Sequence, residues 1–259
     1  MIRVSGKAAM YGELWFDEPM PRKPGVDIVT YRHCAAPVPG MECTHNLSLV
    51  IDLTADEDAI LQGFSAACRQ EIRRAIKDSL QFELLASPDD RLAEFFEFFD
   101  LFARQKSLPP CDRPWLSAAH RAGRLMLTSV SLHGEAPLVW HAYIHCGQAV
   151  WLHHSVSCFR EKDSGTRALT GRANRWLHWQ DMLSFKRMGV KRYDLGGLFQ
   201  DESAPEQEGI NRFKKSFGGR VERQFNGTVP LTLKGRLYLH LRDAWRRWNP
   251  PQARVRAAA

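Results

Sequence analysis

Val190-Lys-Arg-Tyr-Asp-Leu-Gly-Gly197 is the stretch of sequence that decides the fold. Its apolar residues predict a short strand over 191–195, and Gly196 and Gly197 end that strand. Paired glycines allow a ligand to approach bare backbone, because no side chain stands in the way. After a loop, Gly209–Phe217 predicts a short helix closed by two further glycines. The amides of a nearby helix add hydrogen-bond donors to the same place.

One lysine lies on the apolar stripe of this short helix. Ile210, Phe213, Lys214 and Phe217 share one side, whereas Lys215 points away. An ammonium at an apolar boundary needs an anion or a developing negative charge, because its burial alone is costly. We therefore expect Lys214 to be catalytic. The alternative is a lysine that lies along a packed surface and keeps its charge in water.

The rest of the chain predicts an α/β fold with a mixed, mostly antiparallel sheet and helices on both of its faces. Helical patterns cover 54–80, 87–108, 166–187 and 231–248. Alternating or β-branched runs separated by turns predict a three-stranded meander over 125–132, 137–146 and 149–157, and a further strand over 221–229.

Composition excludes several classes of protein. The chain has 259 residues, 44% of them hydrophobic, with a net charge of +7 and no apolar run of 18 residues. These values exclude disordered, collagen-like and membrane-spanning chains. No secretory signal is visible, so we expect a cytoplasmic protein whose six cysteines are reduced. Because the cysteines include no C-x-x-C pair, neither a zinc knuckle nor a redox dithiol is indicated.

Two motifs resemble the FemABX-like branch of the GNAT acyltransferase superfamily. The first is Tyr193-Asp-Leu-Gly-Gly197 followed by Gly209–Gly219, and the second is the arginine-rich helix Phe64–Lys77 behind the strand that ends at Leu53. The resemblance covers about 47–229. It implies a GNAT fold and an N-acyltransferase of cell-envelope or polysaccharide metabolism that uses acyl-CoA or another thioester. The alternative donor is an aminoacyl-tRNA, with a peptidoglycan precursor as acceptor.

The resemblance also implies a set of site residues. No permanently bound cofactor is expected, since acyl-CoA or aminoacyl-tRNA is a co-substrate, and the other partner is a small-molecule amine. The expected catalytic residues are Lys214, His153, His154 and Asp194. The expected substrate-binding residues are Arg69, Arg73, Tyr193, Gly196 and Gly197. The expected donor phosphate loop, just before the helix over 166–187, comprises Arg160, Lys162, Gly165, Thr166 and Arg167.

Histidines on the predicted hairpin offer a general base. If Gly147 and Gln148 form a two-residue turn, His141 faces His154, with Tyr143 and His145 on the same side and His153 opposite. No carboxylate accompanies the imidazoles on these strands, so we expect no metal site. An imidazole titrates near working pH, so His153 or His154 is suited to accept the proton of an attacking amine. A water molecule is the alternative proton acceptor.

Two basic surfaces remain. Arg69, Arg73 and Lys77 recur every four residues, which suits either a phosphate clamp or a solvated helix face. The last helix places leucines and tryptophans on one side and arginines around the rest. It can dock on the domain, lie on an anionic membrane at the inner face, or contact RNA. A non-catalytic RNA- or membrane-binding module is therefore the rival to an enzyme.

We divide the chain accordingly. Residues 1–46 are expected to be an extended segment that packs on the core, 47–230 the GNAT-like domain, and 231–259 a basic amphipathic helix and tail. The last part carries most of the positive charge, with seven Lys and Arg over 234–259 against one Asp. Any peripheral membrane contact is expected through 231–248.

Overall fold

A computed structural model describes residues 1–6, 8–39, 41, 43–87, 91–157, 163–201 and 204–248. The chain forms two compact units. The first contains Met1–Asn46, Pro114–Ala122 and the chain from Arg223, and the second contains Leu47–Arg113 and Gly123–Glu222. The predicted domain over 47–230 included strand 221–229, whereas most of that strand lies with the N-terminal strands in the first unit.

The second unit is built on a mixed sheet. Its strand order is β4 (Cys43–Asp52, from Leu47 onward), β9 (Arg192–Leu198), β8 (Ala149–Ser157), β7 (Pro137–Cys146), β6 (Leu125–Ser131) and β5 (Gln81–Leu85). Only β8 and β9 run parallel, and the other neighbours are antiparallel. The predicted mostly antiparallel sheet is therefore confirmed, as is the meander of β6, β7 and β8.

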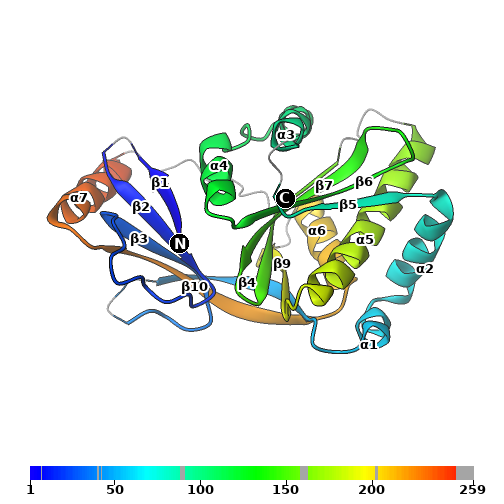
Figure 1. Cartoon of the computed structure of the whole chain (residues 1–259), viewed down its shortest axis with the longest axis horizontal. Helices are drawn as coiled ribbons and strands as arrows, with labels where there is room; N and C mark the ends of the chain where they lie inside the picture. Colours follow the sequence, from blue (N-terminus) through cyan, green and yellow to red (C-terminus); the bar gives the residue numbers. More distant parts are fainter. Residues whose placement is uncertain are drawn as a thin grey trace. The chain divides into compact units, whose positions relative to one another are not determined.

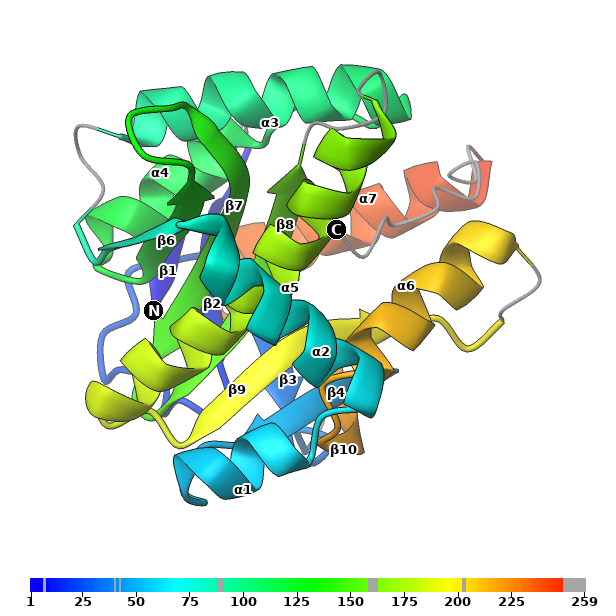
Figure 2. The same cartoon turned by 90° about the vertical axis from the view of Figure 1, so that its right-hand side faces the viewer.

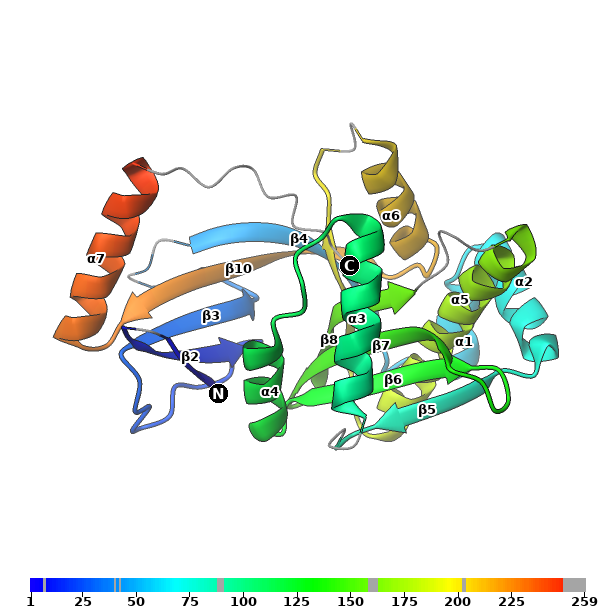
Figure 3. The ribbon, with the colours of Figure 1, turned by 90° about the horizontal axis from the view of Figure 1, so that it is seen from above.

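Helices cover both faces of this sheet. The helices α2 (Ala66–Ala75) and α5 (Ser164–Arg187) lie side by side on one face (Figure 1). On the other face, α3 (Leu92–Lys106) crosses the strands, and its Phe99 ring lies 4.6 Å from that of His154 on β8 (Figure 3). The prediction of helices on both faces is thus confirmed.

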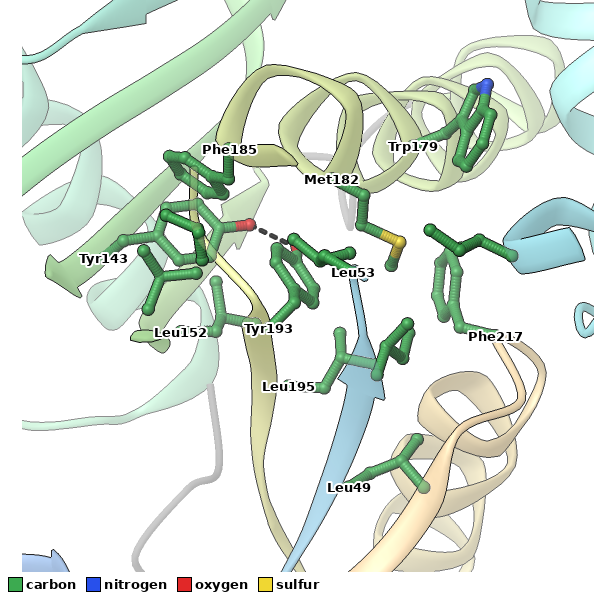
Figure 4. Close-up of a cluster of buried hydrophobic side chains, with 14 of the residues drawn as sticks. Leu49, Leu53, Tyr143, Leu152, Trp179, Met182, Phe185, Tyr193, Leu195 and Phe217 are labelled. Carbon is green, nitrogen blue, oxygen red and sulfur yellow. Dashed lines mark hydrogen bonds between the residues drawn. The ribbon is translucent and has the colours of Figure 1, made fainter. Parts of the chain in front are cut away.

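A buried apolar core lies beneath α5 and includes the strands of the sheet and the residue Phe217 after α6. Buried side chains from five strands and three helices meet there, and Figure 4 shows part of this cluster. Phe217, at the end of α6 (Pro205–Lys215), packs edge-on to Phe64 at 5.3 Å. Tyr143 packs edge-on to Phe185 of α5 at 4.9 Å. The Phe217–Phe64 contact holds the end of α6 against the turn between α1 and α2, so the residues of α6 that face inward have defined positions.

The predicted single helix over 54–80 is wrong, because the chain breaks into three pieces. These are α1 (Glu57–Gln62), α2 and a 3₁₀ turn, η1 (Ile76–Asp78). Ser65 starts α2 by accepting a hydrogen bond from the Cys68 amide at 3.2 Å. Gly218 comes so close to the break that a Cβ there would lie 2.3 Å from the carbonyl oxygen of Gly63. The close approach of two glycine backbones therefore accompanies the break.

The predicted register of the hairpin is also wrong. His141 pairs with Ser155 rather than with His154, because a bulge between Ala142 and Tyr143 on one strand and Leu152 and His154 on the other shifts the pairing by one residue. The extra residue is His153. As a consequence, His141 faces α5, whereas His154 faces α3 on the opposite side of the sheet.

The first unit has its own strands, in the order β1 (Ile2–Ser5), β2 (Met10–Trp15), β3 (Ile28–Cys34) and β10 (Arg220–Pro230). Residues 225–230 of β10 pair with β3, which ties the N-terminal residues to the C-terminal part of the chain. The helix α7 (Leu233–Trp248) follows β10 directly. Most of α4 (Arg113–Arg121), which the sequence pattern missed, also belongs here, and Trp115 donates a hydrogen bond to Glu13 at 3.1 Å. None of the helices over the described ranges is long and apolar enough to cross a bilayer.

Candidate functional site

Lys214 is held in place by the helix that carries it. Asn211, one turn earlier on α6, accepts a hydrogen bond from the Phe199 amide at 3.0 Å and donates one to the Phe199 carbonyl at 2.8 Å. These two bonds tie α6 to the chain that leaves β9. Lys214 is only 4% exposed, whereas Lys215 is exposed, so the predicted inward orientation is confirmed.

The buried ammonium of Lys214 lies at the glycine pair. Its Nζ donates a hydrogen bond to the Gly197 carbonyl at 2.9 Å. A Cβ on Gly196 would lie 3.5 Å from this Nζ and 3.3 Å from the Leu152 carbonyl of β8. Burial lowers the pKa of Lys214 to about 8, an effect that the Asp194 carboxylate opposes. A lysine with such a pKa is a cation that can lose its proton near neutral pH.

Asp194 organises the backbone around this ammonium. Its fully buried carboxylate accepts hydrogen bonds from the Ser48 hydroxyl of β4 and, at 2.9 Å, from the Gly196 amide. Arg192 lies 3.3 Å from the same carboxylate and 2.5 Å from Glu222. Gly196 has φ of +81°, a conformation that favours glycine. Asp194 is therefore a positioning residue, because it fixes the turn of the glycine pair.

The two parallel strands of the sheet separate at this point. Their ladder consists of three pairs and ends where Trp151 pairs with Asp194. Beyond it, β8 continues to Ser157 and β9 to Leu198, and the two strands diverge (Figure 2). On its other side β9 remains paired with β4, where Gly197 faces Ser48. The glycine pair therefore lies just beyond the end of the β8–β9 ladder, where β9 is paired on its β4 side.

The two candidate histidines differ in position. The ring of His154, a half-buried residue, packs against Phe99, and desolvation of the imidazole lowers its pKa to about 4. His153 is half-buried, and its ring lies 5.1 Å from that of Trp151, the residue at the end of the ladder. His153 is thus the imidazole nearer to the strand separation, because Trp151 Nε1 itself would lie 3.7 Å from a Cβ on Gly196.

Tyr193 points into the core, where it joins a buried hydrogen-bond network. Its hydroxyl lies 2.6 Å from that of Tyr143 (Figure 4) and 2.7 Å from His178 Nδ1. The Tyr143 hydroxyl donates to Asp181, which also bonds His141 at 2.7 Å. Burial raises the pKa of both tyrosines and lowers that of His178. These hydrogen bonds connect β7, β9 and α5 inside the core, so the network specifies packing, and the Tyr193 hydroxyl points away from the glycine pair.

Three members of this network have the residue types of a metal site. Ligand atoms of His141, His178 and Asp181 lie within 4.8 Å of one another. However, His141 already uses both ring nitrogens, since its Nε2 also bonds Asn174 at 2.9 Å. The His141 and His178 rings pack against each other in a tilted arrangement, 4.2 Å apart at an angle of 37°. This donor set fits a hydrogen-bond network better than a coordination sphere.

The arginine-rich helix places its basic side chains differently from a phosphate clamp. The Arg69 guanidinium donates to the Gln62 carbonyl at 3.0 Å and to the Phe64 carbonyl, so it closes the turn between α1 and α2. Arg73 is exposed. The guanidinium of Arg69 is therefore bonded to backbone carbonyls of this turn, whereas that of Arg73 makes no such bond there.

The start of α5 contains the described part of the predicted phosphate loop. Gly165, Thr166 and Arg167 lie in its first turn, whereas Arg160 and Lys162 lie outside the described residues. The Asp163 carboxylate caps the helix by accepting hydrogen bonds from the Thr166 amide at 3.0 Å and hydroxyl at 2.6 Å. A carboxylate at this position occupies an amide that a pyrophosphate would use, and its charge repels a second anion.

Two surface pockets of the second unit lie away from these residues. One of about 600 Å³ opens at the edge formed by β5 and β6, and one of about 370 Å³ lies beside the last turn of α6. None of the predicted site residues that the structure describes lines either pocket.

Four residues that contribute to the glycine-pair site were missed from the sequence. They are Ser48, Trp151, Arg192 and Asn211. The only signal for Ser48 is a polar residue within an apolar strand run.

Comparisons with known proteins find similarity in structure alone. Scans against protein-family models and against curated proteins found no match. Among solved structures, FemX aligns with a TM-score of 0.58 and 16% identity, over 75% of this chain and 63% of FemX. The C-terminal domain of a putative lysylphosphatidylglycerol synthetase from Agrobacterium fabrum aligns with a TM-score of 0.54 and 14% identity, over 85% of this chain and 72% of that one. L-PGS from Bacillus licheniformis gives 0.52 and 12%, over 85% and 73%. This chain thus spans less than two thirds of FemX.

Proposed function

Because the chain has the fold of the FemABX-like branch of the GNAT superfamily, we propose that it is an acyltransferase that moves an acyl group from an activated donor to an amine. The observation that carries the proposal is the end of the β8–β9 ladder at Asp194, with the buried ammonium of Lys214 beside it. A buried cation at bare backbone is costly unless it meets a negative charge, and acyl transfer creates one.

The proposed reaction needs no covalent acyl-enzyme. The donor carbonyl lies where the ladder ends, and the amine nitrogen attacks its carbon directly. As the C–N bond forms, the carbonyl oxygen gains negative charge, which Lys214 and backbone amides of β9 stabilise. When the tetrahedral intermediate collapses, the bond to the leaving group breaks and the carrier departs with its electron pair. The proton lost by the amine passes to His153 or water.

His153 is preferred over His154 as the general base. His154 packs against Phe99 of α3, and with a pKa of about 4 it is a weak base at neutral pH. His153 is half-buried and lies next to Trp151. We therefore assign no proton transfer to His154.

Two donors remain, and one observation distinguishes them. Acyl-CoA requires a binding place for its pyrophosphate, and the expected place at the start of α5 holds the Asp163 carboxylate. This favours the alternative donor, an aminoacyl-tRNA, whose activated ester lies far from any pyrophosphate. One of the similar structures is the C-terminal domain of a putative lysylphosphatidylglycerol synthetase, a name that refers to an aminoacylated product. Either donor is a co-substrate and is not retained.

A donor assay tests the proposal. The purified chain is incubated with a panel of soluble amines and either acetyl-CoA or a mixture of aminoacyl-tRNAs, and acylated amines are detected by mass spectrometry. Release of free CoA thiol identifies a thioester donor, whereas product that disappears after RNase treatment identifies aminoacyl-tRNA. Failure to consume either donor faster than the Lys214→Met variant does would contradict an acyltransferase and leave the non-catalytic binding module.

A further inference from the structure

The helix α7 exposes an unusually apolar stripe. It consists of five large apolar side chains at intervals of three or four residues, each at least 59% exposed. They are Leu233, Leu237, Leu241, Trp245 and Trp248. Five residues at this spacing form one continuous side of a helix. Contiguous exposed apolar surface of this kind marks an interaction site rather than ordinary solvent-facing surface.

The stripe is not the side by which α7 packs on its own unit. That side is formed around Gly235, where a Cβ would lie 2.2 Å from the Asp27 carbonyl oxygen. One turn later, the Tyr238 ring packs edge-on to Tyr11 of β2 at 5.8 Å. The Thr232 hydroxyl, at the start of the helix, donates to Asp27 at 2.8 Å. These contacts fix the rotation of α7 beside the strands of the first unit (Figure 1). The side chains of the stripe lie outside these contacts and are exposed.

The charges around the stripe select its partner. Exposed Arg236 and Arg247 lie on the helix outside the docked side, whereas Lys234 is paired with Asp27 at 3.3 Å. The one acid of α7, Asp243, is paired with Arg242. An apolar stripe flanked by cations matches the boundary between anionic headgroups and acyl chains. Two copies of the helix would bring like charges together. RNA would use the cations and leave the leucines in water.

We propose that α7 binds an anionic lipid surface, lying in its plane with the leucine and tryptophan stripe among the upper acyl chains and the basic residues at the level of the lipid phosphates. One helix of this kind gives reversible attachment that weakens with salt. The inference is independent of the proposed acyl transfer, because it uses only residues of α7 and the strands that hold them.

Vesicle flotation of the full chain tests this proposal. Vesicles of phosphatidylglycerol and phosphatidylcholine in equal amounts are compared with vesicles of phosphatidylcholine alone. The charged variant is Leu237→Glu with Leu241→Glu. The matched control is Ile76→Glu, since Ile76 is 62% exposed and Leu237 61%, and Ile76 lies in η1. Because all three side chains face solvent, the variants should fold, which circular dichroism verifies.

The proposal predicts binding to the anionic vesicles and at least about tenfold weaker binding of the double variant, given the transfer free energy of a leucine side chain. The Ile76→Glu protein should bind like the wild type, and added salt should weaken binding. Equal partition of wild type and double variant would overturn the proposal. The proposal would also be overturned if the wild type does not bind vesicles and the double substitution instead abolishes dimer formation or tRNA binding.

Discussion

Lys214 keeps its proton only below about pH 8, because its burial lowers the pKa to about that value. If the ammonium stabilises the developing oxyanion, turnover should decrease as the pH rises through 8. Lys214→Arg keeps a positive charge at all accessible pH values, so the alkaline decrease should disappear in this variant even if its turnover is lower. The measurement is a pH–rate profile at saturating donor. A decrease that persists unchanged in Lys214→Arg would show that another group titrates.

The same residue links stability to pH. The unfolded chain holds the Lys214 proton up to the ordinary pKa of 10.5, whereas the folded protein releases it near 8. Between these values the unfolded state binds more protons, so the free energy of unfolding should rise with pH. The expected result is a wild type that gains stability relative to Lys214→Met between pH 8 and 10. Urea unfolding of both proteins at the two pH values measures it, and a constant difference would contradict the burial of a charged ammonium.

At the scale of elements, the turn after α6 determines where Lys214 lies. Gly218 and Gly189 both have positive φ, +69° and +82°. A Cβ on Gly218 would lie 2.3 Å from the Gly63 carbonyl oxygen, whereas nothing lies within 4 Å of one on Gly189. Gly189→Ala should therefore cost about 1 kcal/mol of stability from backbone strain. Gly218→Ala should cost about 3 kcal/mol or more, because steric overlap adds to the strain. Chemical denaturation compares them, and equal costs would contradict the close approach of α6 and the α1–α2 turn.

Local periodicity predicted most elements but not their interruptions. The apolar stripe of α6 was sufficient to place Lys214 inward, since helix geometry fixes which residues share a side. The bulge at His153 was not predictable, because one extra residue in a strand leaves no signal in a run of Trp, Leu, His and Val. Asp163 can be recognised as a helix cap only from the structure, which shows that α5 begins at Ser164. The capping carboxylate and the bulge are the two features that change the candidate site.

At the scale of the whole molecule, binding and catalysis should separate. The candidate active site and the stripe of α7 share no residue. The Leu237→Glu, Leu241→Glu variant should therefore retain turnover of a soluble amine within about twofold, since exposed substitutions far from special features change stability little. Conversely, Lys214→Met should float with anionic vesicles as the wild type does. Loss of both properties in either protein would mean that the two are coupled.

Contacts between distant parts of the sequence account for what could not be predicted. The pairing of β3 with residues 225–230 joins parts of the chain about 200 residues apart, and neither segment alone indicates its partner. Likewise, Tyr193 was expected to bind substrate because it stands in the recognised motif. Its hydroxyl instead meets Tyr143 and His178, which come from two other elements. Motifs locate the strand, but packing decides which of its side chains face the core.

The paired substitutions Lys214→Met and Lys215→Met test the central claim most directly. Lys214 is 4% exposed beside the glycine pair, and its neighbour on the same helix is exposed to solvent. With the donor that the wild type uses, we expect turnover of Lys214→Met to fall by about 10²-fold to 10³-fold, as when one oxyanion-stabilising donor is removed. Lys215→Met should remain within about twofold of the wild type. Near-normal turnover of a folded Lys214→Met protein would contradict the proposed site.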